Sequence, residues 1–284
     1  LSTLFAVLLV AVLLEWQRNP QDKYLVWLGL IFGLAVGHHA SLAFLALPMV
    51  AFMLCTDKML IRQPRRWLKP LSLFALSFVV LLYLPIRSAM SPAFDTSNID
   101  SVSAFFSHVF ATGFGGDMFY YHTWPELVER LGIWRQIMSL ELGAVLSFAA
   151  LGGMGLLIWR NWRQALLLGG IALVNSAVAI TYKAPQTVEY MLPTYVAAAF
   201  VIGLGYAPPK EHLNLRPISN VALVALTMAV VVLGMGNWPD LQALHEDDST
   251  REYAESILSE APEDALILAG WHQVTPLWYL QIVE

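Results

Sequence analysis

The stretch GLAVGHHASLAFLALP, residues 33–48, places two adjacent histidines, His38 and His39, in an otherwise almost uninterrupted apolar run. The whole run covers residues 24–55, and as one α-helix it would be about 48 Å long at about 1.5 Å per residue. That is too long for one upright crossing of a hydrocarbon core of about 30 Å. Because Gly37 and two polar imidazoles interrupt the pattern, we predict a hairpin of two short helices with the histidines at or near its apex.

The composition of the 284-residue chain indicates whether it folds in water or in a membrane. Hydrophobic residues make up 57% of the sequence, charged residues only 13%, and the mean hydropathy is +0.60. Soluble domains carry about 25% charged residues. We therefore predict an all-α, polytopic membrane protein surrounded by membrane lipids. The single cysteine excludes an intrachain disulfide, and no basic stripe for nucleic acid is present.

Six further apolar segments are candidates for bilayer crossings of about 20 residues each. They cover residues 1–14, 70–84, 140–159, 165–182, 190–206 and 218–236. Residues 1–236 are thus predicted to form a transmembrane helix bundle. Because the chain begins and ends inside apolar or amphipathic segments, both ends are expected to be truncated.

Two segments are predicted to lie outside the bilayer on the same side. The first, 85–139, is a long loop in which Ser101 or Asp100 is expected to cap a helix, followed by an amphipathic piece at 125–137. The second, 237–284, is expected to begin a soluble domain of α/β-like or α-helical structure. Its apolar stretch ALILAG, residues 265–270, is predicted to be a short strand.

The lysines and arginines predict which side of the membrane each loop faces. The stretch DKMLIRQPRRWLK, residues 57–69, is the densest basic cluster and is therefore placed in the cytosol by the positive-inside rule. Alternating the crossings from this anchor puts 11 of the 16 basic residues inside. Five of these 11 residues belong to the stretch 57–69, and the other six cytosolic residues are Arg18, Lys23, Arg160, Arg163, Lys210 and Arg216.

Several polar residues are candidates for a binding site at the outer ends of the crossings. Two histidines at membrane depth favour a polar cavity over lipid contact, although buried histidines also bond to backbone carbonyls. Arg87 could clamp a phosphate or snorkel to lipid headgroups. His108 could transfer a proton. Glu189 and Tyr190 lie at the start of a crossing, where the helix dipole alone favours an acid. No third ligand accompanies the histidines, so no metal site is predicted.

Five motifs, taken in order, resemble one family. They are GLAVGHHASLAFLALP (33–48), YLPIRSAMSPAFD (83–95), FFSHVF (105–110), VEYMLPTYVAAAFVIGLGYA (188–207) and TPLWYLQIVE (275–284). Together they are similar to the transmembrane protein O-mannosyltransferase family, with its bacterial relatives long described as a domain of unknown function. Such proteins are similar to GT-C glycosyltransferases. A bacterial inner membrane is the favoured location, or the ER membrane if the source is eukaryotic.

The resemblance implies transfer of a sugar, such as mannose, from a polyprenyl-phosphate donor to a protein or other acceptor on the outer or lumenal face. No cofactor is evident in the sequence, and whether the reaction requires a metal ion stays open. The family's catalytic carboxylate is expected upstream of Leu1. His39, Arg87 and His108 match family positions, whereas DTSNID, residues 95–100, departs from the family's Trp-Gly-Asp stretch.

Two other functions stay open at this stage. A lipid or small-molecule transporter or flippase would also carry polar groups at membrane depth, but it would show repeat symmetry and paired broken helices. The sequence has one broken hairpin and no internal repeat. The other alternative is a non-catalytic membrane scaffold for an outer domain.

Overall fold

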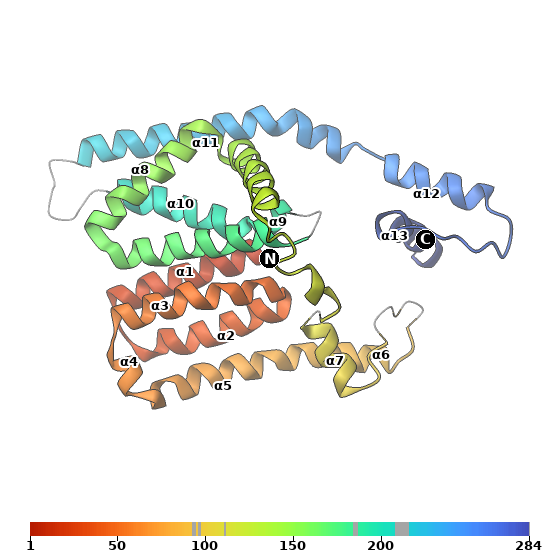
Figure 1. Cartoon of the computed structure of the whole chain (residues 1–284), viewed down its shortest axis with the longest axis horizontal. Helices are drawn as coiled ribbons and strands as arrows, with labels where there is room; N and C mark the ends of the chain where they lie inside the picture. The colour runs from red at the N-terminus through yellow and green to blue at the C-terminus, as the bar shows by residue number, and fades with distance from the viewer. Residues whose placement is uncertain (93–94, 96–97, 111, 184–186, 208–215, 284) are drawn as a thin grey trace.

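The computed structural model describes residues 1–92, 95, 98–110, 112–183, 187–207 and 216–283, and all regular structure in this part of the chain is helical. The predicted all-α class is confirmed. The first half is a row of helices that run back and forth alongside one another (Figure 1). They are α1 (Ser2–Arg18), α2 (Asp22–His38), 3₁₀ helix η1 (Ala40–Leu45), α3 (Ala46–Thr56), α4 (Met59–Arg62), η2 (Pro64–Trp67), α5 (Leu68–Ser77), η3 (Phe78–Leu82) and α6 (Tyr83–Ser88).

The predicted hairpin with the histidines at its apex is confirmed. α2 ends at His38, and His39 leaves the helix with extended backbone angles of φ −151° and ψ 116°. Its Nδ1 atom accepts a hydrogen bond from the backbone N–H of Ser41 at 3.4 Å, which caps the start of η1. At about 1.5 Å per residue, the 17 residues of α2 span about 26 Å, which is close to the thickness of a bilayer's hydrocarbon core of about 30 Å.

The second half is dominated by α8 (Trp124–Thr181), whose backbone is non-helical at two residues. Gly143 has φ +62° and ψ 178°, and Asn161 has φ −153° and ψ 77°, so α8 consists of the segments 124–142, 144–160 and 162–181. A Cβ on Gly169 would lie 3.4 Å from the methyl carbon of Met154. These residues lie at similar distances on either side of Asn161, so the last two segments form an antiparallel hairpin. The predicted crossings at 140–159 and 165–182 correspond to them.

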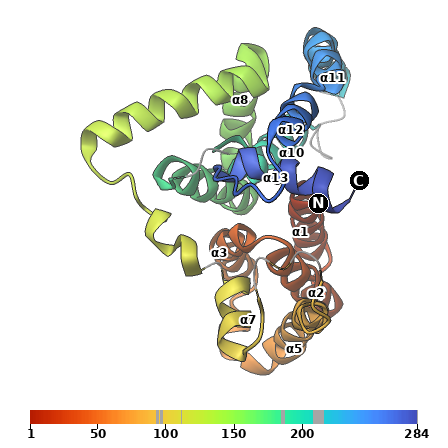
Figure 2. The same cartoon turned by 90° about the vertical axis from the view of Figure 1, so that its right-hand side faces the viewer.

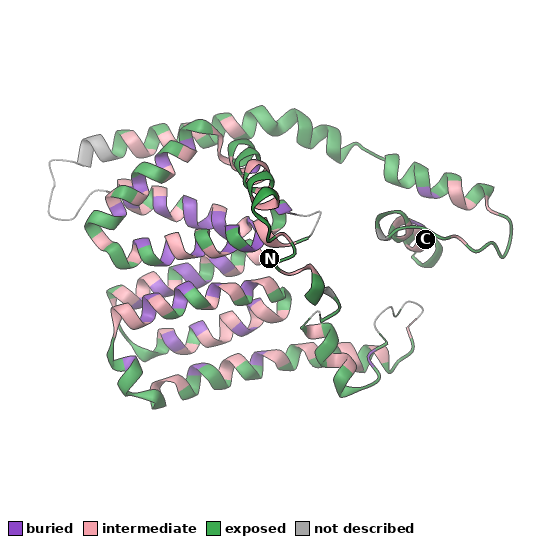
Figure 3. Ribbon diagram, in the orientation of Figure 1, coloured by how far each residue is buried: buried purple, intermediate pink, exposed green. Residues whose placement is uncertain are grey.

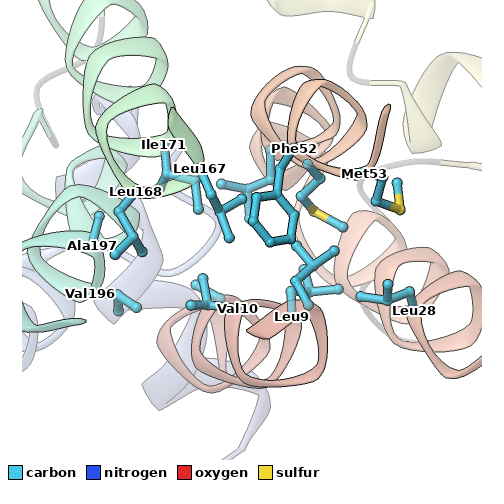
Figure 4. Packing of buried hydrophobic residues seen from close by; sticks show 14 of the residues in the cluster. Leu9, Val10, Leu28, Phe52, Met53, Leu167, Leu168, Ile171, Val196 and Ala197 are labelled. Carbon is cyan, nitrogen blue, oxygen red and sulfur yellow. The ribbon is translucent and has the colours of Figure 1, made fainter. Parts of the chain in front are cut away.

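The core lies where α1, α3, the last segment of α8 and α10 (Leu192–Tyr206) meet (Figures 3 and 4). Leu9, Leu13 and Trp16 of α1 are fully buried, because they lie on the face of α1 that packs against the other helices. Phe52 from α3 and Leu168 from α8 close around it. Burial of such side chains stabilises a fold by about 1.5–3 kcal/mol each where water is the alternative solvent.

Glycines bring α2 and α5 into close contact. Gly29, Gly33 and Gly37 are spaced four residues apart, so they lie along one face of α2. A Cβ on Gly33 would lie 2.6 Å from the carbonyl oxygen of Phe74 and would overlap the Ser77 hydroxyl, whereas Gly37 faces the Leu81 side chain. Small residues at this spacing allow two helix backbones to approach closely, as in many membrane helix pairs.

The remaining elements lie around this bundle. α7 (Val102–Val109) and η4 (Thr112–Asp117) follow α6, with Ser101 as the N-cap of α7, as predicted. α9 (Thr187–Tyr190) precedes α10. α11 (Arg216–His245) runs along one side of the bundle, and the proposed boundary at residue 236 falls inside it. α12 (Ser249–Glu260) and α13 (Trp271–Ile282) pack on each other beyond the end of the bundle (Figure 1), and they lie in front of it when that end faces the viewer (Figure 2).

The predicted strand at residues 265–270 is wrong. These residues have no regular structure, and Leu266 and Leu268 are 86% and 87% exposed. A strand needs a neighbour to pair its backbone groups, and the elements on either side of this stretch are the helices α12 and α13. The short apolar run therefore remains a connector between two helices.

Three helical stretches among the described residues are long and apolar enough to cross a membrane. They are Pro64–Ser88, Trp124–Thr181 and Asn220–Glu260, with mean hydropathies of 1.8, 1.9 and 2.0 over their best windows. Ala40–Thr56 and Leu192–Tyr206 are shorter apolar helices. In the first and third stretches, 6% and none of the window is buried (Figure 3). The apolar side chains of these helices thus face outward.

Candidate functional site

The bundle has two chemically different ends, and the first is basic. At this end the guanidinium of Arg66 donates hydrogen bonds to the carboxylates of Asp22 and Asp57, each at 2.6 Å. The hydrogen bond from Arg66 lowers the pKa of Asp57 below its ordinary value. This ion-pair triad fixes the α1–α2 connection against the stretch that follows α3.

Side chains from the second half of the fold close the same end. The amide of Gln17 bonds to Asn161 at 3.3 Å and to Gln164 at 2.8 Å, and Arg163 donates to the backbone carbonyl of Cys55 at 2.9 Å. The predicted grouping of the stretches around Arg18, Lys23, 57–69, Arg160 and Arg163 at one end is therefore confirmed. Lys210 lies outside the described residues.

The opposite end carries the histidine pair. The ring of His38 lies 5.8 Å from that of Phe5 at the start of α1. His39 lies 5.8 Å from Tyr190 in an edge-to-face arrangement, and its Nδ1 is 2.7 Å from the Ser41 hydroxyl. Both histidines are exposed at the end of the helices rather than enclosed among them. We name this end, with His38, His39 and Tyr190, the histidine end.

Tyr190 is held in place by the end of α8. Its ring lies 5.0 Å from that of Tyr182, which follows the last residue of α8, and the two rings are nearly perpendicular. α8 and α10 both reach the histidine end at this point, so residues far apart in sequence meet. Tyr190 is half-buried, and Glu189 beside it is exposed.

Arg130 joins the segments that surround Tyr190. Its guanidinium donates to the carbonyls of Ala179 and Ile180, at 3.1 and 3.2 Å, and to the Thr187 hydroxyl at 2.9 Å. It also lies over the ring of Tyr121, 4.8 Å from the centroid. A cation that binds the last carbonyls of a helix is favoured by the helix dipole. Arg130 thus links the end of α8, the start of α9 and the loop with Tyr121 that precedes α8.

Polar side chains continue from this end into the bundle. The indole N–H of Trp134 donates to the Ser176 hydroxyl at 3.1 Å, and Ser176 and Thr194 lie 3.4 Å apart. Ser176, Thr194 and the neighbouring Asn175 are buried. Sequence reasoning missed this group and Arg130, because their partners are far apart in the chain. Polar residues inside otherwise apolar segments were the available signal.

The other predicted site residues do not touch the histidines. Arg87 is exposed on α6, six residues beyond Leu81, which itself lies beside Gly37. His108 is exposed on α7. Among the described residues, no hydrogen bond, ion pair or ring contact connects Arg87 or His108 with His38 or His39. The structure therefore brings together His38, His39 and Tyr190, with Glu189 adjacent in sequence, and leaves Arg87 and His108 on the periphery.

The histidine end offers hydrogen-bond donors and acceptors without a metal cage. Within the part of the chain that the structure describes, no three His, Cys, Asp or Glu side chains are grouped closely enough to hold a metal ion. Imidazole and phenol groups can each donate to phosphate or sugar oxygens. Comparison with protein-family models, curated proteins and solved structures found no match to this chain.

Proposed function

We propose that this chain is part of the membrane domain of a GT-C-like glycosyltransferase. It would move a sugar, such as mannose, from a polyprenyl-phosphate donor to a protein or other acceptor on the outer or lumenal face. The placement in a membrane is supported by α5–α6 and α11, because large apolar side chains on them are exposed. Large exposed apolar surfaces indicate contact with lipid or with another protein. Examples are Leu76, Val79, Ile86, Val224, Val231 and Met235.

One observation carries the proposal: the contact between His39 and Tyr190 at the end opposite the basic end. If the basic end faces the cytosol, as the positive-inside rule predicts, the histidine end faces the compartment in which polyprenyl-linked sugars are used. The proposal thus depends on this sidedness. The motifs that carry His39 and Tyr190 are two of the five that support the family resemblance.

In this proposal, residues at the outer ends of the helices bind the lipid-linked donor and stabilise the charge that develops on its phosphate. When the sugar leaves the donor, negative charge develops on the phosphate, and positioned donors stabilise that charge more strongly than the neutral ground state. His39 and Tyr190 can donate hydrogen bonds, and Arg87 can supply positive charge from α6. We assign no catalytic base within this chain.

The test uses the full-length protein in nanodiscs, with labelled polyprenyl-phosphate sugars and an acceptor protein. His39→Ala and Arg87→Ala should each lower the rate of transfer by about 10²-fold or more, the loss typical of removing one charge-stabilising donor. Arg62→Ala is the matched control for Arg87→Ala, because Arg62 is exposed at the basic end, and His245→Ala controls for the loss of an exposed histidine that makes no described contact with His38, His39 or Tyr190. They should transfer sugar at the wild-type rate.

Two results would overturn the proposal. Wild-type transfer by both His39→Ala and Arg87→Ala would exclude their roles in the reaction. Movement of the labelled lipid between leaflets, with no sugar transferred to any acceptor, would identify a flippase instead. Membrane insertion of each variant is checked by protease protection, so that a loss of transfer is not a loss of fold.

A further inference from the structure

A groove of about 670 Å³ lies between α6 and α7, apart from the histidine pair and Tyr190. This volume is within the range of about 300–1,000 Å³ found for small-molecule sites. Its walls are mostly apolar, with Leu82 and Pro85 on one side and Ile99, Val102 and Phe105 on the other. The walls would therefore bind hydrocarbon in preference to a polar ligand.

The polar residues of the groove are acidic or neutral. They include Asp100, whose carboxylate is exposed and forms no salt bridge with any described residue. Ser88 also lines the groove, and its hydroxyl donates a hydrogen bond to the carboxylate of Asp95. Arg87 precedes Ser88 on α6 but is not among the lining residues. Among the described residues that line the groove, Asp100 alone carries a formal charge, and that charge is negative.

The groove is continuous with an apolar surface. Leu82 at the end of η3 is 48% exposed, and Ile86 on α6 is 62% exposed. On α7, Val102 is 74% exposed, and it is four residues from Phe106, which stacks on Phe110 with centroids 6.0 Å apart. Residues at this spacing share one face of a helix. In the membrane placement proposed above, α6 ends a lipid-facing span, so the groove lies at the outer end of that span, where acyl chains meet headgroups.

We propose that the groove binds one acyl chain of a phospholipid that carries a primary amine in its headgroup. The acyl chain lies against the apolar walls, and the ammonium group lies beside the Asp100 carboxylate. An anionic headgroup would place its charge next to Asp100, where like charges repel. The inference rests on the membrane placement alone and not on sugar transfer, so an inactive transferase could still bind this lipid.

The first test is photo-crosslinking in nanodiscs that contain phosphatidylethanolamine with a diazirine in its acyl chain. In the wild-type protein, the label should be found on peptides from residues 82–106. Ala89→Trp fills the groove, because Ala89 lines it, and should lower this labelling about tenfold, a change of about 1.4 kcal/mol in binding. Ala75→Trp is the matched control, since Ala75 is exposed on α5 outside the groove, and should leave labelling unchanged.

The second test distinguishes recognition of the headgroup from binding of the acyl chain, and it uses no variant that fills the groove. Unlabelled phosphatidylethanolamine should compete for the label better than phosphatidylglycerol or polyprenyl phosphate. Asp100→Asn should reduce that preference about threefold, the effect expected for one exposed charge pair. Equal competition by all three lipids in the wild-type protein would overturn the proposed headgroup. Equal labelling of wild type and Ala89→Trp would overturn the groove as the binding site.

Discussion

The imidazole of His39 and the phenol ring of Tyr190 meet edge to face with their centroids 5.8 Å apart, although they belong to the two different halves of the fold. The contact connects the apex of the α2–α3 hairpin with the end of α9, just before α10 begins. We expect Tyr190→Ala to lower the free energy of unfolding by about 0.5–1.5 kcal/mol beyond the lost area, the range for an aromatic pair.

Tyr190→Phe removes the hydroxyl and keeps the ring, so it distinguishes the contribution of the one from that of the other. The ring contact with His39 is kept and only the hydrogen bond between Tyr190 and Tyr182 is lost, so the thermal unfolding midpoint should fall less than in Tyr190→Ala, while sugar transfer should fall if the hydroxyl donates to the substrate. Tyr83→Ala is the control for losing a tyrosine, because Tyr83 is 64% exposed. A Tyr190→Phe variant that unfolds as early as Tyr190→Ala would show that the ring contact contributes nothing.

The Arg66–Asp57 ion pair predicts a dependence of stability on pH. Arg66 lowers the pKa of Asp57 in the folded protein. The stabilisation is therefore present above the unfolded pKa of about 3.9 and is lost as the pH falls through the lower folded value. Asp57→Asn should be less stable than wild type at pH 7 by about 1 kcal/mol or less, because the pair is partly exposed to solvent.

This difference is measured by denaturant unfolding of both proteins at several pH values. It should shrink as the pH is lowered from about 4, because Asp57 then becomes neutral in the wild-type protein as well. Glu15→Gln removes the exposed pair with Arg18 and should change stability little at any pH. A difference between wild type and Asp57→Asn that is independent of pH would contradict the ion-pair explanation.

Close packing of α2 on α5 predicts that larger residues are not tolerated at Gly33. Gly33→Leu would push its side chain into the Phe74 carbonyl and the Ser77 hydroxyl, and overpacking of this kind costs about 1–3 kcal/mol or more. Gly155→Leu is the matched control, because a Cβ there meets no atom within 4 Å. Thermal unfolding in detergent should show a lower midpoint for Gly33→Leu only.

The first kink in α8 predicts a backbone effect at Gly143. Its angles, φ +62° and ψ 178°, belong to a region that essentially only glycine occupies, so Gly143→Ala should cost about 1–3 kcal/mol. Gly132→Ala, in a helical and open part of the same element, should instead gain up to about 1 kcal/mol. Equal midpoints for the two variants in unfolding experiments would argue against the strained angle at Gly143.

The contacts of Arg130 predict that this residue holds the loop before α8 against the end of α8. Arg130→Gln removes the cation that binds the Ala179 and Ile180 carbonyls and lies over Tyr121. Hydrogen exchange should become faster at Tyr121, whose N–H donates to the carbonyl of Thr181. Arg135→Gln serves as the control, because Arg135 is also on α8. Unchanged exchange at Tyr121 would show that Arg130 does not hold the loop.

Local patterns were sufficient for the helices and for the apex at His38 and His39, because apolar runs and a glycine beside polar residues are short-range signals. The grouping of the basic loops followed from charge. The contact of Tyr190 with His39 and the role of Arg130 depend on which helices are neighbours, and no local pattern specifies that. The expected strand at 265–270 was wrong because an apolar run of this length forms a strand only when a partner is available. The four-residue spacing of Gly29, Gly33 and Gly37 was a readable signal for close packing.

The turn at Asn161 has a consequence for biosynthesis. In the membrane placement proposed above, a single non-helical residue joins the segments 144–160 and 162–181, so the linker is too short for one segment to enter the bilayer while the other remains in water. The two are therefore expected to leave the translocon together as a preformed helical pair. A reporter inserted at Asn161 would disrupt the pair itself, whereas reporters placed before Gly143 or after Thr181 should record the same compartment.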